Sequence, residues 1–124
     1  LKGHKGAVHG LAVFSGRLAS CSDDNTVRLW NSTTGALIDV LEGHEAAVRC
    51  VRTIAGWWPR RVTCSGDTTI RLWGPDVVLR GHTSGVWGLA PYVDNGEHRV
   101  ASCSADATVR IWPLAGALQH PLVF

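Results

Sequence analysis

One stretch of sequence occurs three times along the chain, and this repetition constrains the fold more than any other feature. The copies read LASCSDDNTVRLW, VTCSGDTTIRLW and ASCSADATVRIW, and they end at Trp30, Trp73 and Trp112. About 40 residues separate one tryptophan from the next, a period typical of proteins built from repeated structural units. We therefore expect three units of one kind, each packed against its neighbour.

Each copy predicts a β-hairpin. Small residues lead into a polar turn that contains Asp24, Asp67 or Asp106, and short polar side chains favour turns because they bond to nearby backbone. After the turn, apolar and polar residues alternate up to the tryptophan, which is the pattern of a half-buried strand. Because no stretch shows a long helical period, the sequence predicts an all-β protein.

A Gly-His pair precedes each hairpin, at residues 3–4, 43–44 and 81–82. With Gly-His, Ser or Thr, Asp and Trp in phase in three tandem copies, the chain resembles the WD-repeat (WD40) family of β-propellers over essentially its whole length. The repeats span approximately residues 3–42, 43–80 and 81–124. The residue after each tryptophan is Asn31, Gly74 or Pro113, whereas the family usually has Asp there.

The resemblance implies three four-stranded antiparallel blades that form a partial propeller. The expected strands cover residues 7–14, 17–22, 26–31, 36–41, 48–54, 61–65, 69–73, 77–80, 85–90, 98–104 and 108–112, with 117–120 as a candidate for the last. Propellers typically have four to eight blades, so three do not close a ring. We expect either a segment of a larger propeller, in keeping with a start at Leu1, or an assembly of copies, in which a homodimer would supply six blades.

Each repeat contains Ser, His and Asp, the residue types of a nucleophilic catalytic triad. The resemblance implies instead a structural hydrogen-bond network inside each blade, in which a hydroxyl satisfies the imidazole and the buried indole N–H. Its members would be His4, Ser20, Asp24 and Trp30; His44, Thr63, Asp67 and Trp73; and His82, Ser102, Asp106 and Trp112. The hydroxyls of Ser22, Ser65 and Ser104 face the same way and are an open alternative. Since an active site is normally built once, three copies favour structure, and we expect no enzyme.

Other classes of site find no support in the sequence. The histidines of the Gly-His pairs would lie one per blade without converging, so we expect no metal, and no cofactor motif is present. A net charge of +2 with scattered Lys and Arg predicts no nucleic-acid surface, and no apolar window is long enough to span a membrane. Cys21, Cys64 and Cys103 occupy equivalent places in separate blades, roughly 10 Å apart, which is too far for a disulfide. We expect buried, reduced cysteines and a cytoplasmic or nuclear protein.

If the repeats are structural, function lies where they differ. In the family, partners often bind the face that carries the Gly-His and Asp turns, where the positions five after each histidine are His9, Arg49 and Trp87. A second candidate is the loop with Trp57 and Trp58, since two adjacent tryptophans cannot both be buried by one alternating strand. Trp and Arg are also the residues that interfaces prefer.

The sequence therefore predicts a non-catalytic protein–protein interaction scaffold. Its partner would be a protein or peptide of unknown identity, together with missing blades or a second copy of the chain. The alternative is an architectural, self-assembling partial propeller with no ligand of its own.

Overall fold

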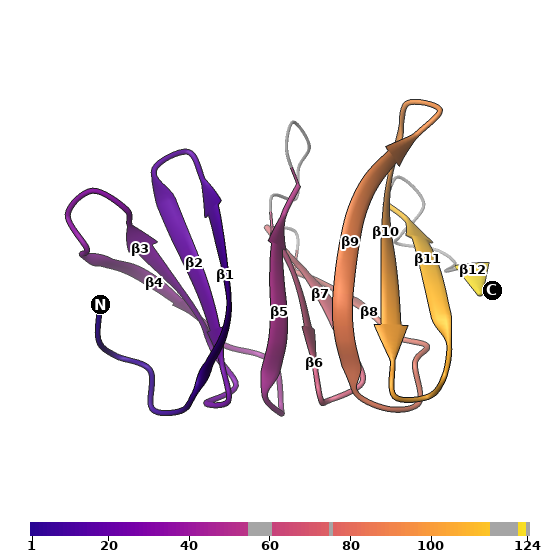
Figure 1. The fold of residues 1–124 in the computed structure, drawn as a ribbon, viewed down its shortest axis with the longest axis horizontal. Helices are drawn as coiled ribbons and strands as arrows, with labels where there is room; N and C mark the ends of the chain where they lie inside the picture. Colours follow the sequence, from indigo (N-terminus) through magenta and orange to yellow (C-terminus); the bar gives the residue numbers. More distant parts are fainter. Residues whose placement is uncertain (55–60, 75, 115–121, 124) are drawn as a thin grey trace.

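The computed structural model describes residues 1–54, 61–74, 76–114 and 122–123, and regular structure in these residues is entirely β-strand (Figure 1). The strands are β1 (Val8–Phe14), β2 (Arg17–Ser22), β3 (Val27–Asn31), β4 (Leu37–Leu41), β5 (Val48–Thr53), β6 (Arg61–Ser65), β7 (Ile70–Trp73), β8 (Val77–Leu79), β9 (Val86–Asp94), β10 (Glu97–Ser104), β11 (Val109–Pro113) and β12 (Leu122–Val123).

Three antiparallel four-stranded sheets follow one another along the chain, in the orders β1-β2-β3-β4, β5-β6-β7-β8 and β9-β10-β11-β12. They stand side by side in a row, with the first strands β1, β5 and β9 adjacent to one another (Figure 1). This arrangement confirms the all-β, bladed architecture expected from the repeat. The first and third sheets lie at opposite ends of the row, and each has one face that no sheet of the described chain covers.

The hydrophobic core lies between the sheets rather than within any one of them. One cluster joins the first two sheets and includes Cys21 and Val27 packed near Val48 and Val51. A larger cluster joins the second and third sheets and includes Cys64 and Ile70 with Val86 and Leu89. Equivalent residues of successive repeats therefore supply each interface, so that one sheet needs the next to bury its apolar face.

The third sheet departs from the sequence expectation in length. β9 runs to Asp94 rather than ending near residue 90, and it pairs with β10 up to Glu97 opposite Asp94. Asn95 and Gly96 form the tight turn between them, with φ angles of 49° and 77°, which is the Asn-Gly hairpin geometry. Pro91 is accommodated because β9 is an edge strand, where a missing N–H costs no ladder hydrogen bond.

The expectation of buried cysteines is correct for Cys21 and Cys64 but wrong for Cys103, which is exposed. The reason is its place in the row: Cys103 lies on the outer face of the third sheet, whereas its two equivalents are covered by the following sheet. The candidate strand at 117–120 and the candidate residues Trp57 and Trp58 lie outside the described residues.

Candidate interaction surface

Each sheet contains the same chain of hydrogen bonds. In the first, His4 Nδ1 lies 2.8 Å from Asp24 Oδ2, His4 Nε2 lies 2.6 Å from Ser20 Oγ, and Trp30 Nε1 donates to Ser20 Oγ at 2.9 Å. The corresponding distances are 2.9, 2.7 and 2.8 Å for His44, Asp67, Thr63 and Trp73. They are 2.8, 2.7 and 2.8 Å for His82, Asp106, Ser102 and Trp112.

The directions of these bonds assign the histidine tautomer. The serine or threonine oxygen accepts the indole N–H, and His Nε2 is the acceptor left for the hydroxyl's own hydrogen. The imidazole hydrogen therefore resides on Nδ1 and is donated to the aspartate. The linking hydroxyls of Ser20, Thr63 and Ser102 are buried, with exposed fractions of 3, 0 and 2%. Each network thus ties the entry turn, the second strand and the third strand of its sheet together.

The second candidate hydroxyl of each repeat has a different task. Ser22, Ser65 and Ser104 each accept the backbone N–H of the aspartate two residues later, at 3.1 Å. Ser65 and Ser104 also donate back to carbonyl oxygens at the entry turn. These serines hold the turn between the second and third strands and leave the indole and imidazole to the other hydroxyl.

The aspartates are held in their ionised form. Burial alone would raise the pKa of Asp67, but bonds from the Thr69 hydroxyl, the Glu45 backbone N–H and His44 lower it to about 2. The equivalent bonds, from the threonine hydroxyl of each turn, hold the pKa values of Asp24 and Asp106 well below their usual range. Burial lowers the pKa of His44 despite the neighbouring Asp67, so the pair is a neutral imidazole on a carboxylate near pH 7.

An arginine in each repeat packs closely against the glycine of the Gly-His pair. Arg71 Nη2 donates to the Gly43 carbonyl at 2.9 Å, and a Cβ on Gly43 would lie 2.7 Å from Arg71 Nη1. Added Cβ atoms on Gly3 and Gly81 would approach the equivalent arginines to 2.9 and 2.7 Å. The role of this arginine was not apparent from the sequence, although its strict recurrence at Arg28, Arg71 and Arg110 was a usable signal.

Two of the three predicted contact residues on the Gly-His edge come together. Arg49 is the second residue of β5 and Trp87 the second residue of β9, and the Arg49 guanidinium carbon lies 4.6 Å from the centroid of the Trp87 ring. Trp87 nevertheless remains 54% exposed. His9, at the same position in β1, bonds through Nε2 to the exposed Asp23 carboxylate of its own sheet and is not part of the pair.

Small residues let the second and third sheets approach closely beside this pair. A Cβ on Gly85 would lie 3.4 Å from the Gly66 Cα, so the entry turn of the third sheet rests on the aspartate turn of the second. The Arg49–Trp87 pair thus lies on two strand ends whose neighbouring turns are in close backbone contact. The result is an exposed aromatic ring with a cation fixed on it.

A hollow of about 250 Å³ lies at the opposite edge of the same two sheets. Its lining combines apolar and polar side chains, namely Thr53, Ile54, Pro91, Tyr92, Val93 and His98. The sequence did not single it out, because it depends on the extension of β9 beyond residue 90.

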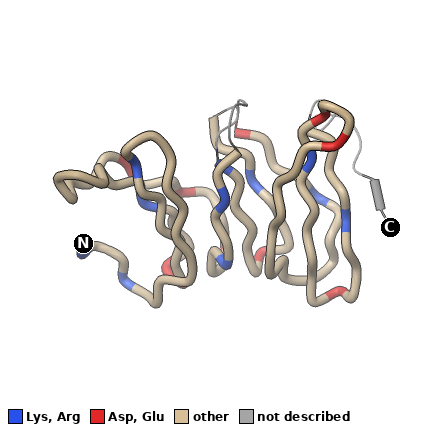
Figure 2. Tube along the Cα trace, turned by 45° about the horizontal axis from the view of Figure 1, so that its top comes forward, with Lys and Arg blue, Asp and Glu red and all other residues tan. Residues whose placement is uncertain are grey.

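Charge and metal chemistry give no competing site among the residues that the structure describes. Lys and Arg are spread over all three sheets without a continuous basic stripe (Figure 2). Within the same residues, no three His, Cys, Asp or Glu side chains gather closely enough to hold a metal ion. The described part of the chain also contains no helix able to cross a membrane.

Comparison with known proteins agrees with this geometry. The family model for "WD domain, G-beta repeat" matches residues 1–31, 35–74 and 75–113. The WD repeat-containing protein pop2 of Schizosaccharomyces pombe is 33% identical over 96 residues, which cover 76% of this chain and 13% of pop2. Cell division control protein 4 of Saccharomyces cerevisiae is 42% identical over 52 residues, covering 41% of this chain and 7% of that protein.

A solved structure gives the same result at the level of the fold. The computationally designed Ika4 protein superposes with a TM-score of 0.80 at 28% identity, covering 98% of this chain and 74% of its own. The chain spans 13% of pop2 and 17% of the protein transport protein SEC13 of Coccidioides immitis, which is 40% identical over 53 residues, 40% of this chain. The three in-phase hydrogen-bond networks and the matching family model together establish that the chain belongs to the WD40 family of repeat proteins.

Proposed function

We propose that this chain is a non-catalytic interaction scaffold that binds a protein or peptide at the Arg49–Trp87 pair. WD40 repeats generally mediate protein interactions. The observation that carries the proposal is the stacking of Arg49 on a Trp87 ring that stays 54% exposed. Trp and Arg dominate the energetics of protein interfaces, and a large exposed aromatic side chain commonly marks a contact site.

The pair also indicates what the partner offers. Stacking on Trp87 restricts the Arg49 side chain before binding, which lowers the entropy lost when a partner docks. A peptide that places a carboxylate on the Arg49 guanidinium and an apolar side chain on the open face of Trp87 fits this chemistry. His9 adds a polar group at the same edge of the first sheet.

The Ser-His-Asp sets support a structural role. A nucleophilic hydroxyl has to reach its substrate, but the Thr63 hydroxyl is fully buried and already accepts the Trp73 indole N–H. The same holds for Ser20 and Ser102 in the neighbouring sheets. The free cysteines fit a cytoplasmic or nuclear location, which we include in the proposal.

Peptides selected against the chain from a displayed random library provide the test. We expect Trp87→Ala and Arg49→Ala each to weaken binding of the selected peptides at least tenfold by isothermal titration calorimetry. Ile38→Ala, an exposed residue on β4 of the first sheet, is the matched control and should leave affinity unchanged. Selected peptides that bind the two edge variants as tightly as the unaltered chain would refute the proposal.

A second candidate function, self-assembly, is favoured by the two open faces of the row. Val48 and Val86 are fully buried by the preceding sheet, whereas their equivalent in the first sheet, Val8, is 51% exposed. Val27 and Ile70 are fully buried by the following sheet, whereas their equivalent Val109 is 50% exposed. Each open face therefore has the composition of a surface that another blade covers inside the molecule.

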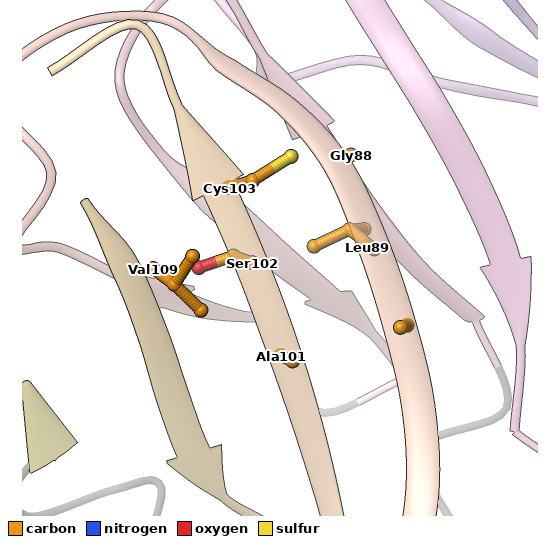
Figure 3. A pocket seen from close by; sticks show the side chains of 7 residues that line it. Gly88, Leu89, Ala101, Ser102, Cys103 and Val109 are labelled. Atoms are coloured by element: carbon orange, nitrogen blue, oxygen red, sulfur yellow. The ribbon is translucent and has the colours of Figure 1, made fainter. Parts of the chain in front are cut away.

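The outer face of the third sheet is hollowed where such a blade would sit. The hollow measures about 250 Å³ and is lined by residues that include Ala101, Cys103 and Val109 (Figure 3). Val8 and Leu11 on β1 are the equivalents of Val48 and Val51 on β5, which pack against the first sheet. In a second copy, Val8 and Leu11 would pack in the same way against the outer face of the third sheet. We infer that two copies pair head to tail, each contributing three blades to a six-bladed ring.

Sedimentation velocity over a hundredfold range of concentration tests this assembly. We expect a dimer that Val109→Asp and Leu11→Asp each convert to a monomer, with Ile38→Asp as a control that leaves the dimer intact. A chain that stays monomeric at every concentration would exclude self-assembly, and the end faces would then be covered by further blades or remain open.

A further inference from the structure

Two cysteines face each other across neighbouring strands of the central sheet. Cys50 on β5 is the register partner of Cys64 on β6. Directly opposed residues of an antiparallel pair have Cα atoms about 4.5–5.5 Å apart, which lies within the range a disulfide spans. Cys64 belongs to the hydrophobic cluster between the second and third sheets, and Cys50 packs against the same cluster. The two side chains therefore lie on one face of the central sheet. The sequence expectation considered cysteines of separate blades and missed this pair within one blade.

The flanking sheets show how close the two sulfurs can come. The position of Cys50 is occupied by Gly10 in the first sheet and Gly88 in the third, opposite Cys21 and Cys103. A Cβ on Gly10 would lie 3.1 Å from Cys21 Sγ, and one on Gly88 would lie 3.2 Å from Cys103 Sγ. Figure 3 shows the Cys103 sulfur directed toward the strand that carries Gly88.

These distances match disulfide geometry. In a disulfide the separation between one Cβ and the sulfur across the bond is about 3.0 Å, given an S–S bond of about 2.05 Å. At this position the central sheet has Cys50, which carries a Cβ and a sulfur, whereas both flanking sheets have glycine. The central sheet therefore has two opposed thiols, one on each strand, whereas each flanking sheet has a single thiol opposite a glycine.

The surroundings give the two thiols different reactivity. The Cys64 thiol and the nearby Arg52 stabilise the Cys50 thiolate and lower the pKa of Cys50. Donating that hydrogen bond, together with burial, raises the pKa of Cys64. Cys50 is only partly buried whereas Cys64 is buried, so Cys50 is the more accessible of the two thiols to a small reagent in solution.

We propose that Cys50 and Cys64 form a redox-sensitive thiol–disulfide pair whose oxidant is a low-molecular-weight disulfide of the glutathione type. The Cys50 thiolate attacks one sulfur of glutathione disulfide, forms a mixed disulfide and releases one glutathione thiolate. The Cys64 sulfur, losing its proton to solvent, then attacks the Cys50 sulfur, closes the Cys50–Cys64 bond and releases the second glutathione. The protein loses two hydrogens and two electrons, and one glutathione disulfide becomes two glutathione molecules.

Peptide mapping of the unaltered chain tests the pair directly. The chain is equilibrated with glutathione buffers of increasing disulfide content, remaining thiols are alkylated, and trypsin is applied without reduction. Arg52 and Arg61 lie between the two cysteines, so trypsin separates the segments Cys50–Arg52 and Val62–Arg71. We expect these segments to appear joined, two hydrogens lighter than their sum, in a fraction that rises with the disulfide content of the buffer. Cys21, in another tryptic segment, should remain alkylated.

Variants identify the order of events. Cys64→Ser should accumulate the mixed disulfide of glutathione at Cys50, whereas Cys50→Ser should abolish the joined segments and leave Cys64 alkylated. Cys103→Ser is the matched control, because it removes the exposed thiol of the third sheet and should leave the Cys50–Cys64 bond unchanged. The proposal is wrong if Cys50 and Cys64 both remain thiols in the most oxidising buffer. It is equally wrong if glutathione stays on Cys50 in the unaltered chain, or if either cysteine joins Cys21 instead.

Discussion

The hydroxyl of Thr63 is the junction of the central network, and its removal gives a measurable stability change. It accepts the Trp73 indole N–H at 2.8 Å and lies 2.7 Å from His44 Nε2, in a site with no exposure to solvent. Thr63→Val keeps the shape of the side chain and deletes both bonds. Each buried polar group left without a partner costs about 1–3 kcal/mol. Because Trp73 is half-buried and can recruit water, we expect a total loss of about 2–4 kcal/mol.

Thr63→Ser is the control that separates hydrogen bonding from packing. It removes one buried methyl group, worth roughly 1 kcal/mol, and keeps the hydroxyl that Ser20 and Ser102 supply in the other sheets. Urea unfolding followed by tryptophan fluorescence measures both. With an m-value of about 1.5 kcal/mol/M, a loss of about 3 kcal/mol lowers the midpoint by roughly 2 M. If Thr63→Val unfolds at or above the midpoint of Thr63→Ser, the hydrogen-bond networks do not hold the blades together.

Three further changes test other parts of the account. Stability should fall from about pH 6.5 downward, because His44 has a lowered pKa in the folded state and is protonated first in the unfolded state. It should fall again from about pH 4 toward pH 2, as Asp67 loses the charge that its hydrogen bonds stabilise in the folded state. Urea midpoints that stay level between pH 7 and pH 3 would contradict this. Thr68→Asn should stabilise the chain by about 0.5–1 kcal/mol, because Thr68 has a φ of 76° and Asn25 fills the same left-handed position in the first sheet; a lower thermal midpoint would count against it. Gly43→Ala should cost about 1–2 kcal/mol, because Gly43 has a φ of 155° and an added Cβ would also displace the Arg71 guanidinium. Gly66→Ala, where the third sheet has Ala105, should change stability by less than about 0.5 kcal/mol; equal effects of the two in chemical unfolding would refute the assigned role of Gly43.

The sequence was sufficient for features that repeat. Three in-phase copies predict three hairpins, and an indole whose N–H must be satisfied predicts that a hydroxyl lies close to it. The sequence left open whether Ser20 or Ser22 would take this place, because residues two apart on a strand face the same way.

Features that depend on a single blade or on its neighbours were harder to predict. Cys103 has the same local sequence as Cys64, and its exposure follows from its position at the end of the row. The equivalence of Arg49 and Trp87 predicted that they lie at the same edge of adjacent sheets, but their stacking depends on side-chain geometry that spacing does not encode. The Cys50–Cys64 pair required the strand register, which shifts at a bulge between Val48 and Cys50.

The histidine tautomers provide the most direct measurement of the central claim, that the polar sets are networks that hold the blades. Long-range proton–nitrogen correlation spectra of the labelled chain near pH 7 report which imidazole nitrogen carries hydrogen. We predict the Nδ1–H form for His4, His44 and His82, each with a slowly exchanging indole N–H on Trp30, Trp73 or Trp112. Nε2–H tautomers at these three histidines, with indole hydrogens that exchange as fast as those of an unfolded chain, would contradict the account.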